Sequence, residues 1–314
     1  MLRLGSKGSD VKQLQLFLGL KADGDFGPIT ERAVKEWQSK NNLVNDGIVG
    51  PRTLSAMGLV DTNISSGDED LDNDSVVRGG LVINKAFMPK DEYYAGPTEK
   101  RWLFWHHTAG WNNPYKTIRN WGNDTRGRVA TEFCLGGQKI TDNNNQFDGE
   151  VVQAFPEGGY AWHLGVGRKP VHTESVGIEV NCFGQLTKGG YRKNKTWIEK
   201  DRSKFYTYVG TEAHPDQVFD LGYEFRGFQY WHNYSDKQIA SLKELTLYIA
   251  ERDNIDVRKG LPELVRKYGA LDAFDFYDVR LVEKNPGLWC HTNVRPGKVD
   301  MYPHPKLVEM LLSL

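Results

Sequence analysis

The stretch Leu103-Phe104-Trp105-His106-His107-Thr108-Ala109 (LFWHHTA) joins an apolar run to two adjacent histidines. An apolar run of this length predicts a buried β-strand, which we place at Trp102–Thr108. An imidazole at the end of such a strand projects from a rigid element into a cleft at the edge of the sheet. His106 and His107 are therefore the first candidate functional residues.

Similar runs follow along the C-terminal part of the chain. The pattern predicts a helix over Asp236–Arg252, capped by Ser235, because its apolar residues recur at helical spacing and make one buried face. Short strands that alternate with helices are typical of an α/β domain. The further predicted strands are Val129–Leu135, Val151–Phe155, Val176–Cys182 and Tyr223–Tyr230.

A repeat organises the first 60 residues. Each copy reads as a helix, an Asp-Gly turn and a Gly-Pro pair that suits the first turn of the next helix. This self-similarity predicts two alike units packed on each other in a small all-α, three-helix domain. The matched positions are Val11-Lys12, Gln15, Asp23-Gly24, Gly27-Pro28 and Thr30, which return 23 residues later as Val34-Lys35, Gln38, Asp46-Gly47, Gly50-Pro51 and Thr53.

Length and composition indicate two domains of a soluble protein. The chain has 314 residues, 39% hydrophobic and 26% charged, and its 40 basic and 41 acidic residues leave a net charge of −1. This balance excludes a strongly basic nucleic-acid-binding protein, and no apolar run is long enough to insert into a membrane.

We expect domains at 1–60 and 81–314, joined by a flexible linker at 61–80 that carries six acids and one Arg. That segment lacks the spacing of a calcium-binding loop.

The start of the chain and the cysteines bear on the compartment. Charged residues interrupt the first 20 residues, so a secretory signal is not expected and synthesis should end in the cytosol. Three widely spaced cysteines argue against a disulfide framework and favour buried thiols. Cys290, beside His291, is left open as an alternative metal ligand.

Two residues near the C-terminus complete a candidate metal site with His106. His291 opens the run CHTNVRPGKVD, and Asp300 follows nine residues later, after a reversal at Pro296-Gly297. Two imidazoles, one carboxylate and an open fourth position are what a hydrolytic zinc site requires, whereas Mg²⁺ or Ca²⁺ prefers more oxygen ligands. We expect one Zn²⁺ in this domain.

Four segments resemble, in order, the zinc-dependent N-acetylmuramoyl-L-alanine amidases of the type 2 amidase and peptidoglycan recognition protein family: FWHHTAG, AWHLG (161–165), SVGIEV (175–180) and HTNVRPGKVD (291–300). The resemblance implies a mixed central β-sheet flanked by helices, with zinc ligands at His106, His291 and Asp300. It also implies hydrolysis of the amide between muramic acid and L-alanine in peptidoglycan.

The resemblance assigns further roles. Lys298 matches the lysine that stabilises the oxyanion, and Glu179 matches a glutamate that acts as base or orients the water in one branch of the family. A lone Glu in an apolar strand is costly unless it is partnered or functional, which supports that match. His107, Trp162 and His163 are expected in the substrate cleft. Another branch uses a Tyr, but this chain has Thr131 and Glu132 at that strand.

The N-terminal repeat, with DGDFGP and DGIVGP, resembles the small helical peptidoglycan-binding domain found beside bacterial and phage cell-wall hydrolases. Asp23, Phe26, Trp37 and Asp46 are the residues we expect at its binding groove. The alternative is that the repeat only builds a helical core. Two extensions, 186–235 and 254–288, either wall the catalytic cleft or only enlarge the fold, and the sequence leaves this open.

Together these features predict a modular phage endolysin, a bacteriolytic enzyme made in the host cytoplasm that reaches the cell wall in the periplasm after the membrane is breached. Its partner would be bacterial peptidoglycan, with no nucleic acid and no membrane insertion, and a monomer is the working expectation. A zinc peptidase that cuts the stem peptide and a non-catalytic peptidoglycan recognition protein remain as alternatives.

Overall fold

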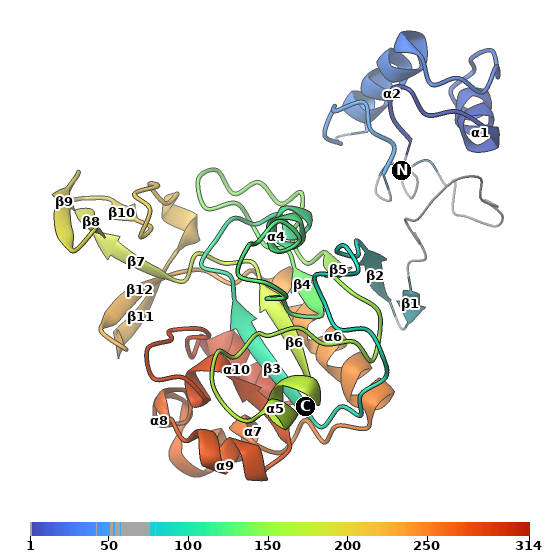
Figure 1. Cartoon of the computed structure of the whole chain (residues 1–314). Helices are drawn as coiled ribbons and strands as arrows, with labels where there is room; N and C mark the ends of the chain where they lie inside the picture. Colours follow the sequence, from blue (N-terminus) through green and yellow to red (C-terminus); the bar gives the residue numbers. More distant parts are fainter. Residues whose placement is uncertain (1, 42, 51–52, 54–56, 58–75, 79) are drawn as a thin grey trace. The chain divides into compact units, whose positions relative to one another are not determined.

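Two units, residues 1–70 and 71–314, each have a hydrophobic core of their own (Figure 1). The computed structural model describes residues 2–41, 43–50, 53, 57, 76–78 and 80–314. The third helix expected in the first unit falls mainly outside these residues, as does most of the acidic linker. Within the described part of the chain, no helix combines the length and apolar character that a membrane span needs.

The first unit contains α1 (Ser9–Phe17) and α2 (Pro28–Lys40). In each repeat the Nε2 of a buried glutamine lies within hydrogen-bond distance of the Asp side chain of its turn, a backbone carbonyl in that turn and the next threonine hydroxyl, among which its two N–H groups are shared. The acceptors are Asp23, Asp25 and Thr30 for Gln15, and Asp46, Ile48 and Thr53 for Gln38, at 2.7–3.2 Å. The repeated polar positions therefore have a structural reason: they tie each turn to its helix.

A seven-stranded mixed sheet forms the centre of the second unit. β3 lies between β6 and β13 and pairs with both in parallel, whereas β1 pairs with β2 in antiparallel register. Residues 76–78, which we expected in the linker, form β1. The strands, in sheet order, are β1 (Val76–Arg78), β2 (Leu81–Lys85), β5 (Val151–Gln153), β4 (Phe133–Leu135), β6 (Ser175–Val180), β3 (Trp102–His107) and β13 (Gly287–Cys290).

Helices cover both faces of this sheet (Figure 1). One face packs on α6 (Asp236–Asp253), α7 (Leu261–Tyr268), α8 (Ala270–Asp275) and α10 (Pro305–Leu312), and the other packs on α4 (Pro114–Trp121), α5 (Lys169–Thr173) and α9 (Val279–Lys284). Side chains alternate along β3. Leu103 and Trp105 therefore pack on the face covered by α6, and Trp102 and Phe104 pack on the opposite face.

Most predicted elements are confirmed, with two differences. α6 begins after Ser235, whose Oγ accepts the Gln238 amide at 2.9 Å. The strand predicted at Val129–Leu135 is shorter, since only Phe133–Leu135 pair. The single strand predicted at Tyr223–Tyr230 is wrong, because a turn at Arg226-Gly227 divides it into β11 (Val218–Phe225) and β12 (Phe228–His232).

The first extension is a subdomain with its own small core (Figure 1). It contains a four-stranded sheet in the order β10, β7, β12 and β11, and a hairpin of β8 and β9. Ile140, Phe183, Leu186 and Ala213 are buried there. Its remaining elements are β7 (Gln185–Lys188), β8 (Gly190–Lys193), β9 (Thr196–Glu199), β10 (Phe205–Tyr206) and the short helix η1 (Pro215–Gln217). The second extension supplies α7, α8 and α9.

Candidate active site

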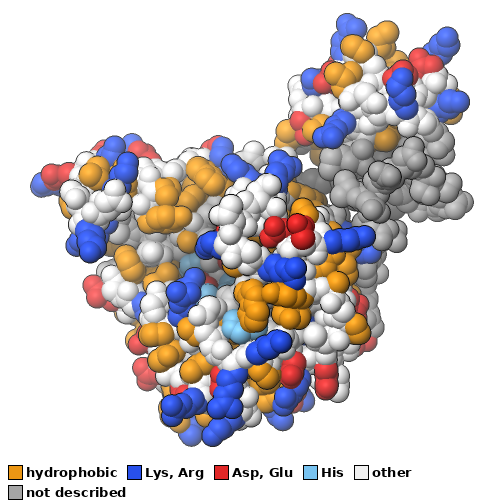
Figure 2. All heavy atoms as spheres, viewed as in Figure 1, with side chains coloured by type: hydrophobic (Ala, Val, Ile, Leu, Met, Phe, Trp, Pro, Cys, Tyr) orange, Lys and Arg blue, Asp and Glu red, His pale blue; other side chains and the backbone are white. Residues whose placement is uncertain are grey.

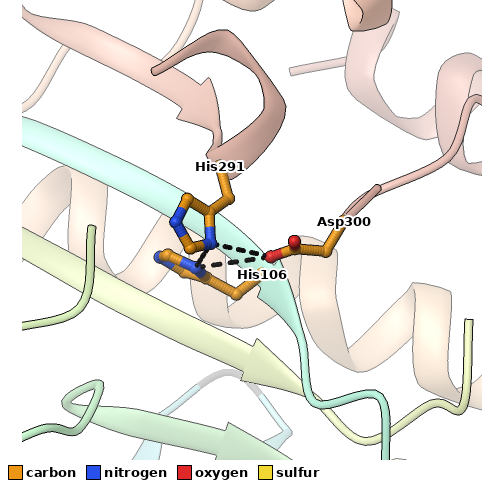
Figure 3. Close-up of side chains that lie close together, drawn as sticks. All are labelled: His106, His291 and Asp300. Atoms are coloured by element: carbon orange, nitrogen blue, oxygen red, sulfur yellow. Dashed lines mark hydrogen bonds and ion pairs between the residues drawn. The ribbon is translucent and has the colours of Figure 1, made fainter. Parts of the chain in front are cut away.

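His106, His291 and Asp300 point toward one another at the end of β3 (Figure 3). His106 is in β3, and His291 follows the neighbouring strand β13 in the short helix η2 (His291–Asn293). The two Nδ1 atoms are 2.9 Å apart, and Asp300 Oδ2 lies 2.9 Å from His291 Nδ1 and 3.6 Å from His106 Nδ1. All three side chains are buried. Parallel pairing of β3 with β13 brings together residues 185 positions apart.

A chain of hydrogen bonds fixes which nitrogen of His106 carries the proton. The Ser175 hydroxyl donates to the His172 carbonyl and accepts from His163 Nε2 at 2.7 Å. His163 Nδ1 is then free to accept from His106 Nε2, 3.0 Å away. The lone pair of His106 therefore lies on Nδ1, the atom that faces Asp300. Burial, followed by the charge of His291, lowers the pKa of His106 to about 4, so the ring is neutral at pH 7.

His291 is oriented in the same way. Its Nε2 donates to the carbonyl oxygen of Leu164 at 3.0 Å, which leaves the lone pair on Nδ1. Two imidazole lone pairs and a carboxylate oxygen thus converge, with the three ligand atoms within 4.8 Å of one another. Facing acceptors repel unless a cation lies between them, so this donor set fits a metal ion. Two nitrogens and one oxygen suit zinc better than Mg²⁺ or Ca²⁺.

The three residues line a cavity of about 330 Å³ that also includes Glu179 and Lys298. Histidine side chains are visible in a recess of the face drawn in Figure 2. Glu179 is the residue of β6 directly opposite His106 in the parallel register. Lys298 lies on the loop between His291 and Asp300. The cavity thus places a carboxylate, an ammonium group and the three candidate ligands around one space.

Glu179 has a strongly altered acidity. Burial, followed by the negative charge of Asp300, raises its pKa to about 8, and the positive charge of Lys298 opposes this shift. A carboxyl group with a pKa near neutrality can accept a proton and return it. Perturbed acidity of this kind is typical of functional sites.

His107 and Trp162 also line the cavity. His107 Nδ1 lies 3.1 Å from the Tyr234 hydroxyl, and its buried Nε2 has no hydrogen-bond partner among the described residues. A side chain at position 184 would meet this Nε2 at 2.5 Å, which explains the glycine there. Gln185 Oε1, at the start of β7, is a second buried atom at this cavity for which the described part of the chain offers no hydrogen-bond partner.

The alternatives that the sequence raised have other contacts. Thr131 lines the cavity, but its hydroxyl donates to the Phe133 carbonyl at 2.9 Å. Glu132 is ion-paired with Arg252 at 2.6 Å. Cys290 is fully buried in the core, where burial raises the pKa of its thiol. It is not one of the three clustered ligands.

In the first unit, one expected binding residue is misplaced. Phe26 is 0% exposed and belongs to the core of that unit, so its side chain cannot contact a ligand and that expectation is wrong. Asp23 and Asp46 are exposed but accept the glutamine amides described above. Trp37 is partly exposed and packs edge to face with Phe17. A role in binding stays a prediction for Asp23, Trp37 and Asp46.

Ser175, Leu164 and Gln185 were not selected from the sequence. Ser175 acts on His106 through His163, and the Leu164 carbonyl bonds His291 directly. Gln185 reaches the cavity from the start of β7, next to the first extension. Ser175 lies in the SVGIEV segment and Leu164 in the AWHLG segment. The two segments therefore indicated this part of the site, but not the hydrogen bonds that Ser175 and Leu164 make there.

Residues 97–268, more than half of the chain, match the family model described as N-acetylmuramoyl-L-alanine amidase. The chain belongs to this amidase family. The matched range contains His106, His163 and Glu179 but ends before His291 and Asp300. Residues 7–57 match a putative peptidoglycan-binding domain. The chain therefore joins a peptidoglycan-binding domain to an amidase-family domain, whose fold is the mixed sheet described above.

One similar protein is the zinc D-Ala-D-Ala carboxypeptidase of Streptomyces albus G. The two sequences are 42% identical over 59 residues, which cover 16% of this amidase-family chain and 23% of the carboxypeptidase. The chain thus spans about a quarter of that relative's length. A Burkholderia AP3 phage endolysin structure is 41% identical, with a TM-score of 0.18, over 19% of this chain and 26% of that one. The amidase LysC of Clostridium intestinale is 13% identical, with a TM-score of 0.31, over 71% and 91% of the two chains.

Proposed function

We propose that this protein is a zinc-dependent N-acetylmuramoyl-L-alanine amidase that degrades bacterial peptidoglycan. The observation that carries the proposal is the convergence of His106 Nδ1, His291 Nδ1 and Asp300 Oδ2 beside Glu179 and Lys298 in one cavity. Membership of the amidase family supports the same activity.

A zinc ion held by His106, His291 and Asp300 would supply a Lewis acid and a water molecule of lowered pKa. Glu179 accepts a proton from the attacking water and transfers it to the leaving amine of L-alanine. The Lys298 ammonium group donates to the oxyanion that develops on the scissile carbonyl oxygen. The C–N bond breaks, and the products are a muramic acid carboxylate and a free peptide amine.

His107, Trp162 and His163 are proposed to contact the substrate around this centre. Trp162 offers an aromatic surface, and the unpartnered Nε2 of His107 can bind a polar group of the muramyl peptide. His163 uses both ring nitrogens for Ser175 and His106, so its contact with substrate would come from the face of the ring.

We further propose that the protein acts as a phage endolysin. The peptidoglycan-binding domain would hold the enzyme on the wall and raise the local substrate concentration. The protein would be made in the host cytoplasm and reach the wall once the membrane is breached.

Mass analysis of digested cell walls tests this function. An amidase releases peptides with a new N-terminal L-alanine and glycans with free lactyl carboxylates, and a zinc chelator should abolish both products. Cleavage within the stem peptide would instead identify a peptidase. Binding to walls without any cleavage in the presence of zinc would identify a recognition protein.

A further inference from the structure

Arg226 lies in the turn between β11 and β12, at the tip of a hairpin of the first extension, and its side chain is only 9% exposed. A guanidinium group has five N–H donors, and here each has an acceptor. Nε donates to Asp275 Oδ1 at 2.9 Å, Nη1 to the carbonyls of Pro296 (3.1 Å) and Lys298, and Nη2 to the carbonyls of Asp275 (3.0 Å) and Thr292 (3.3 Å).

Three of these carbonyls belong to the loop that connects His291 to Asp300. The ends of this loop are joined by a bond from the Thr292 amide to the Asp300 carbonyl at 3.1 Å. Arg226 binds the loop near its start, at Thr292, and again at Lys298, the residue that carries the cavity ammonium group. The contact to the Lys298 carbonyl fixes the backbone from which that side chain extends.

We propose that Arg226 is a positioning residue that holds Lys298 in the cavity, and that the first extension contributes to catalysis through this contact. The inference rests on the proposed amidase function and deepens it. Asp275, in the second extension, orients the guanidinium group through both its side chain and its carbonyl. The two extensions therefore meet on the catalytic loop.

The planar fork of Arg226 is necessary for this role. A lysine at this position would offer three donors on a single nitrogen, whereas Arg226 uses two separate nitrogens to bond the carbonyls of Thr292, Pro296 and Lys298. A groove of about 460 Å³ borders Arg226, Asp275, Tyr277 and residues 296–299. Water from this groove can solvate the carbonyls that an Arg226 variant frees, so we expect such variants to fold.

The first arm of the test is hydrogen exchange of the full-length, zinc-loaded protein, followed by mass spectrometry. Arg226→Ala and Arg226→Lys should both accelerate exchange of the amides of residues 292–299, with a melting temperature close to that of the wild type. Gln229→Ala is the matched control, because Gln229 lies on the same hairpin and bonds Asp220 at 2.8 Å, away from the catalytic loop. Its exchange over 292–299 should equal that of the wild type.

The second arm is a double-mutant cycle between Arg226 and Lys298, read as kcat on a soluble muramyl peptide. Arg226→Ala alone should lower kcat by about 10- to 100-fold, the scale of a small misplacement of a catalytic group. In a Lys298→Ala background the same substitution should lower kcat by less than about threefold, because the residue through which it acts is gone.

Each outcome decides the inference. Faster loop exchange together with a non-additive cycle supports it. Unchanged exchange over 292–299 would overturn it, and so would an additive cycle, since a merely structural role costs the same in both backgrounds. If the wild-type protein cleaves no amide, the proposed function fails, and the exchange arm still decides whether Arg226 holds the loop.

Discussion

Among single residues, the hydrogen bonds that run from Ser175 through His163 to His106 determine how a candidate metal ligand is oriented. They leave the lone pair of His106 Nδ1 free to bind a metal ion. Partners that orient a ligand in this way commonly change metal affinity by about 10- to 100-fold when removed. His163→Ala should therefore weaken zinc binding by about that factor, measured by competition with a chromogenic chelator. His214→Ala, at a partly exposed histidine of the extension, serves as control, and equal affinities in both variants would contradict the role of His163.

Two carboxylates of the cavity should have separable effects. Asp300→Ala should lose zinc and hydrolysis together, whereas Glu179→Gln should keep one zinc per chain and lower kcat by about 10²- to 10⁴-fold, the usual contribution of a general base. Zinc content by mass spectrometry and the rate of muramyl-peptide hydrolysis check both statements. Glu157→Gln, on the surface, should keep both properties. A Glu179→Gln protein with normal activity would show that another group takes the proton.

Residue types and spacing were sufficient to select His106, His291 and Asp300, because few side chains bind zinc and both segments match family motifs. The structure brings the three together. Ser175, Leu164 and Arg226 could not be selected in this way. Ser175 acts on His106 only through His163, Leu164 bonds a histidine 127 positions away, and Arg226 lies in a hairpin turn that the sequence pattern missed. Phe26 was misread because an aromatic residue in a turn can equally be a core residue.

Among the secondary-structure elements, His232 at the end of β12 bonds both the segment between β6 and β7 and the short helix η1. Its Nδ1 accepts the Phe183 amide at 3.0 Å, and its Nε2 lies 3.1 Å from Gln217 Oε1, so the ring must be neutral. Burial, followed by the charge of His107, lowers the pKa of His232 to about 3 from 6.5. A histidine with a lowered folded-state pKa takes up protons on unfolding, so its stabilisation is complete above pH 6.5 and is lost as the pH falls toward 3.

This linkage predicts that acidification from pH 7.5 to 5.0 lowers the free energy of unfolding of the metal-free protein by roughly 2 kcal/mol through His232 alone. His232→Asn keeps an acceptor for the Phe183 amide and removes the titration. Urea unfolding at the two pH values should show a pH-dependent loss that is smaller by about this amount in His232→Asn and unchanged in His214→Asn. Equal losses in all three proteins would mean that His232 does not titrate in this range.

Long and strongly patterned elements were predictable, and short ones were not. β3 and α6 follow from their apolar patterns because each buries a continuous face. β13, which carries the backbone to His291, has only four residues and lies beside three short helices of the second extension. The turn at Arg226-Gly227 was hidden inside an aromatic run. Such elements are fixed by tertiary pairing, which a single sequence does not contain.

At the scale of the whole molecule, the peptidoglycan-binding domain and the amidase-family domain should have separable tasks. A variant that begins at Leu71 should hydrolyse a soluble muramyl peptide at about the rate of the full chain, since the cavity lies within residues 71–314. On intact walls, at enzyme concentrations below saturation, it should be about tenfold slower or worse, because tethering is lost. Turbidity and soluble-substrate assays measure the two rates. Equal lysis of walls by both proteins would contradict the proposed role of the first domain.

The organisation into two domains was readable from the repeat and from the change of composition after residue 60. The sequence could not say whether the extensions were functional, because their effect depends on where they contact the rest of the fold. The structure gives the first extension its own core and places Arg226 against the loop between His291 and Asp300.

A crystal structure of the zinc-soaked protein, with anomalous data at the zinc edge, would show whether His106, His291 and Asp300 hold one metal ion. We expect one anomalous peak at about 2.0–2.2 Å from His106 Nδ1, His291 Nδ1 and an Asp300 carboxylate oxygen. A peak elsewhere in the molecule, or none with His106 and His291 still in direct contact, would contradict it.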